Sequence, residues 1–229
     1  MIKPSQKIKG KIDELLTEKQ HSSAELERNV GILFSLKIVV NVLYALMYFQ
    51  LFLILPRMDD PELKIHSLSE IFNMNTEGLI VIIVGLLMLT IYWIQFNKQL
   101  GNLVRSSPLH GALAILQMIS LMMYLYFVRI DIESDGMVLA LQMESVFLAL
   151  AGFIGAVNWY YAKKNKLTSK NINEDEKKTI LFSILPEPLA ASFSFLFATV
   201  SQLAWTLSFL IIIPLSYVLK RMAKKNFSN

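Results

Sequence analysis

The chain has 229 residues, of which 54% are hydrophobic and only 17% are charged. This composition is too apolar for a soluble domain of that length and is typical of a polytopic membrane protein. The net charge of +4 could suggest nucleic-acid binding, but the Lys and Arg residues lie in short segments between apolar stretches, where they set membrane topology, so we exclude it. Cysteine is absent, which excludes disulfides, thiol chemistry and Cys-ligated metals.

Residues 1–30 are polar and charged. Apolar residues recur at helical spacing between positions 8 and 16, which predicts a short amphipathic helix on the cytoplasmic surface or against a partner. Ser22 and Glu25 fit a capping box, so a new helix is expected to begin directly after that serine and to carry Arg28 below the lipid. The segment lacks the apolar core of a cleaved signal peptide, and we expect the first span to act as the targeting signal.

The first apolar stretch, residues 31–55, contains a single charge and is long enough to cross a bilayer core of about 30 Å. Its polar side chains Lys37, Asn41, Tyr44 and Tyr48 recur at helical spacing and so share one face. Such a stripe avoids lipid, because polar groups are costly in hydrocarbon. It can serve as a helix–helix contact or as the wall of an ion or solute path, and the sequence leaves both interpretations open.

Hydropathy predicts five further spans and so a six-helix membrane domain over residues 31–219, followed by a basic tail at 220–229: about 78–97, 109–130, 137–162, 179–198 and 202–219. The last two could form one long span, but two helices with a turn near Ser201 fit the length, the fifth being kinked at its prolines. In the fourth span, Ala151 with Gly155 and Gly152 with Ala156 give a face of small residues suited to close helix contact.

The distribution of Lys and Arg tests this six-span topology. Eighteen of the 22 lie in the four segments expected on one side, three lie in the loops expected on the other, and the remaining one is Lys37. The positive-inside rule therefore predicts that both termini are cytoplasmic. The opposite surface should carry a short interfacial helix beginning near Ser67 and a negative charge. The acids expected there are Asp59, Asp60, Glu62, Asp131, Glu133 and Asp135.

Three ionisable side chains fall inside the predicted spans, namely Lys37, Glu144 and Glu187. Each needs a partner or water. Lys37 and Glu187 lie roughly 9 Å and 12 Å from the same membrane edge at 1.5 Å per residue, so we predict that they form an ion pair. Glu187 also fits a carboxylate at a helix N-terminus beside Pro188, and both interpretations stay open. Glu144 lies nearer the opposite side.

The sequence contains no phosphate-binding loop, no G-x-S-x-G elbow, no H-E-x-x-H and no Gly-rich dinucleotide turn. Its three histidines, His21, His66 and His110, are dispersed over different segments, so we do not expect a metal site. We therefore expect neither enzymatic activity nor a cofactor, and a permeating monovalent cation is the only small ligand predicted.

Motif positions occur in a characteristic order along the chain. Arg28 precedes Phe34 and Ser35 in the first span, Trp93 closes the second, and a proline-containing fifth span precedes a Trp-bearing sixth. Over nearly its full length this layout resembles the prokaryotic branch of the transmembrane protein 175 family of potassium channels. The positions of the family's Asp and His are occupied by Leu36 and Phe96.

The resemblance implies a homo-oligomer, expected to be a tetramer, in a bacterial plasma membrane, with a central pore lined by the first helix of each subunit. The positions equivalent to the family's constriction are Asn41, Ala45 and Tyr48, and Ile38 and Tyr44 are expected to line the pore beside them. This location coincides with the polar stripe derived from the sequence.

We therefore predict an all-α membrane protein with six spans that conducts cations, with potassium as the expected ion. A second hypothesis is a secondary transporter of a small solute, in which the broken fifth helix and Glu144 form a midplane site. A third is a non-conducting membrane scaffold whose N-terminal segment binds a partner.

Overall fold

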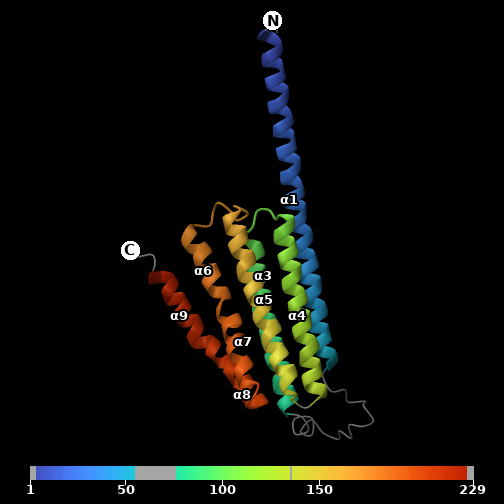
Figure 1. The fold of residues 1–229 in the computed structure, drawn as a ribbon, viewed down its shortest axis with the longest axis vertical. Coiled ribbons are helices and arrows are strands. Elements are labelled where there is room, and N and C mark those ends of the chain that lie inside the picture. The colour runs from blue at the N-terminus through green and yellow to red at the C-terminus, as the bar shows by residue number, and fades with distance from the viewer. Residues whose placement is uncertain (1–3, 55–75, 135, 226–229) are drawn as a thin grey trace.

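The computed structural model describes residues 4–54, 76–134 and 136–225, with side chains placed at residues 23–53, 80–134 and 136–223. All the regular elements described are helices, and they lie alongside one another in a bundle beyond which α1 protrudes (Figure 1). In chain order they are α1 (Pro4–Ile54), α3 (Thr76–Gly101), α4 (Pro108–Glu133), α5 (Val138–Lys164), α6 (Glu174–Ile184), α7 (Pro186–Phe197), α8 (Gln202–Ser208), the 3₁₀ helix η1 (Phe209–Ile211) and α9 (Ile212–Lys225).

Six helical stretches are long and apolar enough to cross a membrane, which confirms the predicted number of spans. They are Ser23–Leu53, Ile80–Gly101, Pro108–Glu133, Val138–Lys164, Glu174–Phe197 and Gln202–Ala223. Residues 179–219 contain two spans, as predicted, and the turn between them ends at Ser201, whose hydroxyl caps α8 by accepting from the Ala204 amide. The predicted interfacial helix at Ser67, the loop acids before it and Asp135 lie outside the described residues.

The expected helix start after Ser22 is wrong, because α1 is continuous from Pro4 to Ile54. A capping box favours a helix start only where the preceding chain is not helical. Residues 11–30 contain neither Gly nor Pro and are rich in Glu, Lys and Leu, which are strong helix formers. The helix therefore extends through the cap signal, and the predicted amphipathic helix and the first span form a single element.

Prolines interrupt the last two spans. The fifth is divided into α6 and α7 at Leu185, where Pro186 has no amide hydrogen to continue the α-helical ladder, so the predicted kink is confirmed. In the sixth, a 3₁₀ turn over Phe209–Ile211 precedes Pro214, which again cannot donate to the carbonyl four residues earlier.

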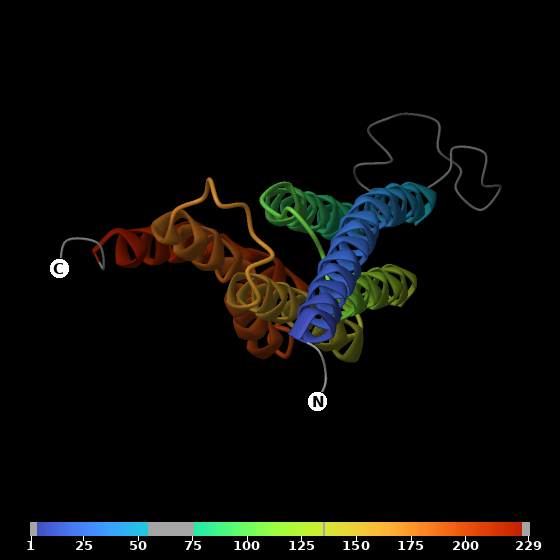
Figure 2. The ribbon, with the colours of Figure 1, turned by 90° about the horizontal axis from the view of Figure 1, so that it is seen from above.

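The bundle is centred on α5 rather than on α1. In the most apolar 18-residue stretch of α5, half of the residues are buried. The buried share of the corresponding stretch is 28% in α1 and 11% in the last span. α5 packs against α4 and α7 and also touches α3, α6 and α8, whereas α3 and α4, at one side, are the only described helices that α1 packs against (Figure 2). The small-residue face of α5 makes close contacts as predicted, since a Cβ placed on Gly152 would lie 2.7 Å from the Tyr92 hydroxyl and from Pro188 Cβ.

We call the end of the bundle from which α1 protrudes the basic end. It is formed by the connections 102–107 and 165–173, which are joined by hydrogen bonds from the Val104 amide to the Leu167 carbonyl (3.0 Å) and from the Ser169 amide to the Asn102 carbonyl (2.9 Å). The opposite end holds the turn at Gly136 and the start of α8. From the opposite end, α8 and α9 run back towards the basic end (Figure 1).

Candidate functional site

Three of the five predicted pore positions lie on the uncovered side of α1. Ile38 has 50% of its surface exposed, and Asn41 and Ala45 are exposed as well. Large apolar side chains are exposed on the same helix, among them Phe34, Val42, Leu46, Phe49 and Phe52. The uncovered surface of α1 is therefore mostly apolar, and Ser35, Asn41 and Gln50 are exposed polar residues within it.

The polar stripe of α1 forms hydrogen bonds to α3. The Asn41 amide donates to the Lys37 carbonyl (2.9 Å), and Asn41 Oδ1 accepts from Trp93 Nε1 (3.1 Å). Further along, the Tyr48 hydroxyl donates to Thr90 Oγ1 (2.9 Å). The sequence leaves open whether the polar stripe is a helix–helix contact or the wall of an ion or solute path. The hydrogen bond of Tyr48 favours the helix–helix contact for that residue. Asn41 both bonds to α3 and is exposed.

Tyr44 lies in the core, so its predicted place on an open pore face is wrong within one chain. Its side chain is 1% exposed and packs edge-on against Phe96, with ring centroids 6.5 Å apart. The polar stripe runs along the border of the buried face of α1, which turns position 44 inward and position 41 outward. That buried face consists of Leu33, Leu36, Val40, Tyr44, Met47 and Leu51.

Of the positions that carry the family resemblance, those on α1 are exposed to solvent or lipid, whereas the one on α3 is hydrogen-bonded to α1. Arg28, Phe34 and Ser35 are all exposed on α1, and Phe34 is 66% exposed. Trp93 is 39% exposed on α3 and binds Asn41. Trp93, the motif residue of the second span, is therefore linked to the first span by its hydrogen bond to Asn41.

The predicted ion pair between Lys37 and Glu187 is not formed. Among the described residues α1 does not touch α6 or α7, so equal depth along the bundle does not bring the two side chains together. Glu187 is 5% exposed and lies in the first turn of α7. This placement agrees with the other interpretation, a carboxylate at a helix N-terminus.

Glu144 is an ionisable group in the interior of the bundle. It is fully buried, and neither carboxyl oxygen has a hydrogen-bond partner among the described residues. Asp131 and Tyr124 of α4 interact with it electrostatically. Asp131 is also fully buried and accepts a hydrogen bond from Gln202 Nε2 (3.0 Å). The Tyr124 hydroxyl has no hydrogen-bond partner in the part of the chain that the structure describes. None of the ion pairs between described residues neutralises either acid.

A short hydrogen-bonded chain of side chains starts at the residue after Glu144. Ser145 Oγ accepts from Trp205 Nε1 (2.8 Å) and lies 2.9 Å from Ser194 Oγ, which connects α5 to α8 and α7. Sequence reasoning missed this chain and the burial of Asp131, which was expected on a negative outer surface. Glu133 does lie at the surface, where it pairs with Arg129 (2.7 Å). The burial of Asp131 could have been predicted from its position two residues before Glu133 on a helix. Two such residues lie on different faces, so they cannot both face the outer surface in the same way.

The described residues contain no group of three or more His, Asp or Glu side chains that could hold a metal ion. His110 is buried at the start of α4, where its Nδ1 lies 2.9 Å from Ser106 Oγ. The side chains of His21 and His66 lie outside the described residues.

The six apolar helices define a polytopic integral membrane protein, and this architecture is common to channels and transporters. No protein-family model, curated protein or solved structure matches this chain.

Proposed function

We propose that this protein is a passive cation channel in which several copies of the chain place their α1 helices around a central pore. The observation that supports this assembly is the uncovered side of α1. The helix packs against α3 and α4 on one side and leaves Ile38, Asn41 and Ala45 exposed on the other. A helix can line a pore between subunits only if its own bundle leaves it open.

The residues on that side suit a gated pore. A wall of mostly apolar side chains can close a channel by dewetting, and a polar group within it supplies a place where a cation exchanges part of its hydration shell. Trp93 holds the Asn41 amide in one orientation by its hydrogen bond. We infer potassium as the ion, four as the number of subunits and a bacterial plasma membrane from the resemblance in layout to the transmembrane protein 175 family, and cytoplasmic termini from the Lys and Arg distribution.

Recording from the purified full chain in planar bilayers tests the proposal, with unitary potassium currents as the expected result. Ile38→Asn should raise the current, because a polar side chain in the apolar wall of the pore favours wetting. A barrier lower by about 1.4 kcal/mol would raise the rate of conduction about tenfold. Ile119→Asn is the matched control, since Ile119 is equally exposed but lies on α4. Equal effects of the two substitutions, or no currents at all, would contradict an α1-lined pore.

The buried acids favour a second candidate, a cation-coupled secondary transporter. Uncompensated carboxyl groups inside a membrane bundle are typical of proton or cation relays. Glu144 lies on α5, which packs against both halves of the broken fifth span, and neither of its carboxyl oxygens has a hydrogen-bond partner among the described residues. In that case Glu144→Gln should abolish ion-dependent uptake into vesicles, whereas Ile38→Asn should leave uptake unchanged. A scaffold would give neither currents nor uptake.

A further inference from the structure

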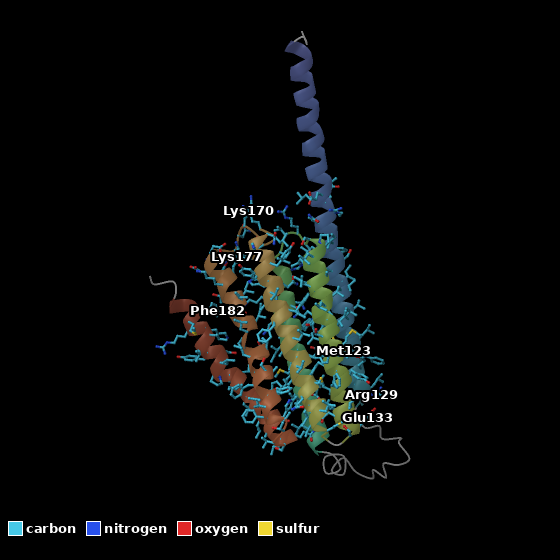
Figure 3. The ribbon with its side chains drawn as sticks, in the orientation of Figure 1. Met123, Arg129, Glu133, Lys170, Lys177 and Phe182 are labelled. Carbon is cyan, nitrogen blue, oxygen red and sulfur yellow. The ribbon has the colours of Figure 1, made fainter. Side chains whose placement is uncertain are left out.

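A cavity of about 990 Å³ opens at the basic end, between α1, α5, α6 and the two connections 102–107 and 165–173. Six basic residues line it, namely Arg105, Lys163, Lys164, Lys166, Lys170 and Lys177. Figure 3 places Lys170 and Lys177 at this end of the molecule, and Arg129 and Glu133 at the other. The proposed channel and the buried acids do not use this cavity.

The positive charge of the cavity is only partly neutralised. Glu174 is its one acidic lining residue, and it pairs with Lys163 (3.0 Å) and Lys177 (2.9 Å). The other four cations form no ion pair with the described side chains. Several like charges around one concave surface repel one another, and an anion bound between them relieves that repulsion.

The walls of the cavity are held in place. The antiparallel bridge between Leu103 and Thr168 joins the two connections beneath it. Trp159 Nε1 donates to the Lys177 carbonyl (2.9 Å), which fixes the first turn of α6 against α5. Lys166 has φ 54°, in the left-handed region that glycine adopts at the lowest cost. The turn therefore carries a lysine at a position where the backbone would favour glycine. A rigid site loses less entropy when it binds a ligand.

Apolar side chains border the same cavity. Leu26, Val104 and Tyr160 line it and are 48%, 51% and 57% exposed. Cations, a tyrosine and aliphatic groups therefore meet at the end of the membrane spans, where the headgroup region of a bilayer adjoins the acyl chains. A soluble anion would use only the cations, whereas a lipid would use both kinds of surface.

We propose that this cavity binds the phosphate headgroup of an anionic phospholipid. The lysines contact the phosphate, and the exposed apolar residues contact the glycerol and the first carbons of the acyl chains. Basic pockets between spans are a recurrent form of headgroup recognition in membrane proteins. The proposal is independent of the channel, because it rests on a different surface of the bundle.

Calorimetric titration of the delipidated full chain in neutral detergent with dioctanoyl phosphatidic acid tests it. Lys164, Lys166 and Lys170 are exposed, so changing all three to Gln should leave the thermal unfolding temperature unchanged. Each cation near a phosphate contributes about fivefold, so the triple variant should bind about a hundredfold more weakly. Lys98→Gln is the matched control, because Lys98 is an exposed cation at the same end that does not line the cavity.

Two further titrations identify the ligand. Dioctanoyl phosphatidylcholine should bind much more weakly than phosphatidic acid, and equal affinity for the two lipids would overturn the proposal. Glycerol 3-phosphate lacks acyl chains and should bind more weakly as well. If it binds as tightly as the lipid and loses affinity in the triple variant, the phosphate site is supported and a soluble anion replaces the lipid as its ligand. Equal affinities of the triple variant and Lys98→Gln would overturn the site itself.

Discussion

Gly152 lies where α5 makes its closest approach to its neighbours. The Tyr92 hydroxyl, which donates to the Leu148 carbonyl (2.8 Å), and the ring of Pro188 occupy the space that a side chain would fill. Gly152→Ala should therefore destabilise the protein by about 1–3 kcal/mol through overpacking, and lower its thermal unfolding temperature in detergent by several degrees.

Gly31 provides the control for this substitution. A Cβ placed there, in the middle of α1, would meet no described atom within 4 Å outside its own stretch of helix. Gly31→Ala should leave the unfolding temperature unchanged or raise it slightly, because alanine is favoured over glycine in a helix by about 0.5–1 kcal/mol. If both alanine variants unfold at the same temperature, the contact at Gly152 does not limit stability.

Glu144 is expected to lower the stability of the fold, because its buried carboxyl group forms no hydrogen bond with the described residues. A buried carboxyl group without a hydrogen bond costs about 1–3 kcal/mol, so Glu144→Leu should raise the unfolding temperature. Glu133→Leu should change it little, because Glu133 is exposed in a surface pair with Arg129. A lower unfolding temperature for Glu144→Leu would mean that the carboxyl has a partner and would remove the argument for a functional acid.

The sequence predicted the depth of these residues along their spans better than the direction in which their side chains point, for a physical reason. Depth along a span follows directly from residue count, so the burial of Glu144 and Glu187 could be predicted. The direction in which a side chain points depends on which helices pack against its own, and one sequence does not specify that. For this reason Tyr44 turned inward, Lys37 formed no ion pair with Glu187, and Asp131 was buried.

At the level of the element, capping signals had to be interpreted in context. Ser22 and Glu25 match a capping box but lie inside α1, whereas Asn173 and Glu176 form one that begins α6. The difference lies in the preceding residues, since the chain before Asn173 is an irregular connection that contains no helix to be continued. The fifth span consequently begins at Glu174, several residues before the start predicted from hydropathy.

The Asn173 cap gives a test at this scale. Asn173 Oδ1 accepts from the Glu176 amide (2.7 Å), and the Glu176 carboxylate accepts from the Asn173 amide (3.2 Å). Asn173→Ala should cost about 1 kcal/mol and speed amide hydrogen exchange in the first turn of α6. Asn171→Ala, in the same connection but outside the cap, should not. Equal exchange in the two variants would contradict a stabilising role for the cap.

For the whole molecule, hydropathy and proline positions sufficed to predict six spans and the kink of the fifth. They could not predict that α5 is the centre of the bundle, because that depends on contacts among spans of similar composition. The small-residue face of α5 was the one sequence signal of its central place, since only a helix with close neighbours on several sides requires such a face.

The side of the membrane on which each end lies can be tested directly, because the chain contains no cysteine and single cysteines can be introduced without removing others. Asn171 and Arg221 are exposed towards the basic end, and Ser134 is exposed at the opposite end. An impermeant maleimide added to intact cells should label Ser134→Cys alone. Asn171→Cys and Arg221→Cys should be labelled only after the membrane is permeabilised, since the positive-inside rule places their segments in the cytoplasm. Labelling of Asn171→Cys and Arg221→Cys from opposite sides would contradict the six-span topology, because an even number of crossings requires that both segments share one side.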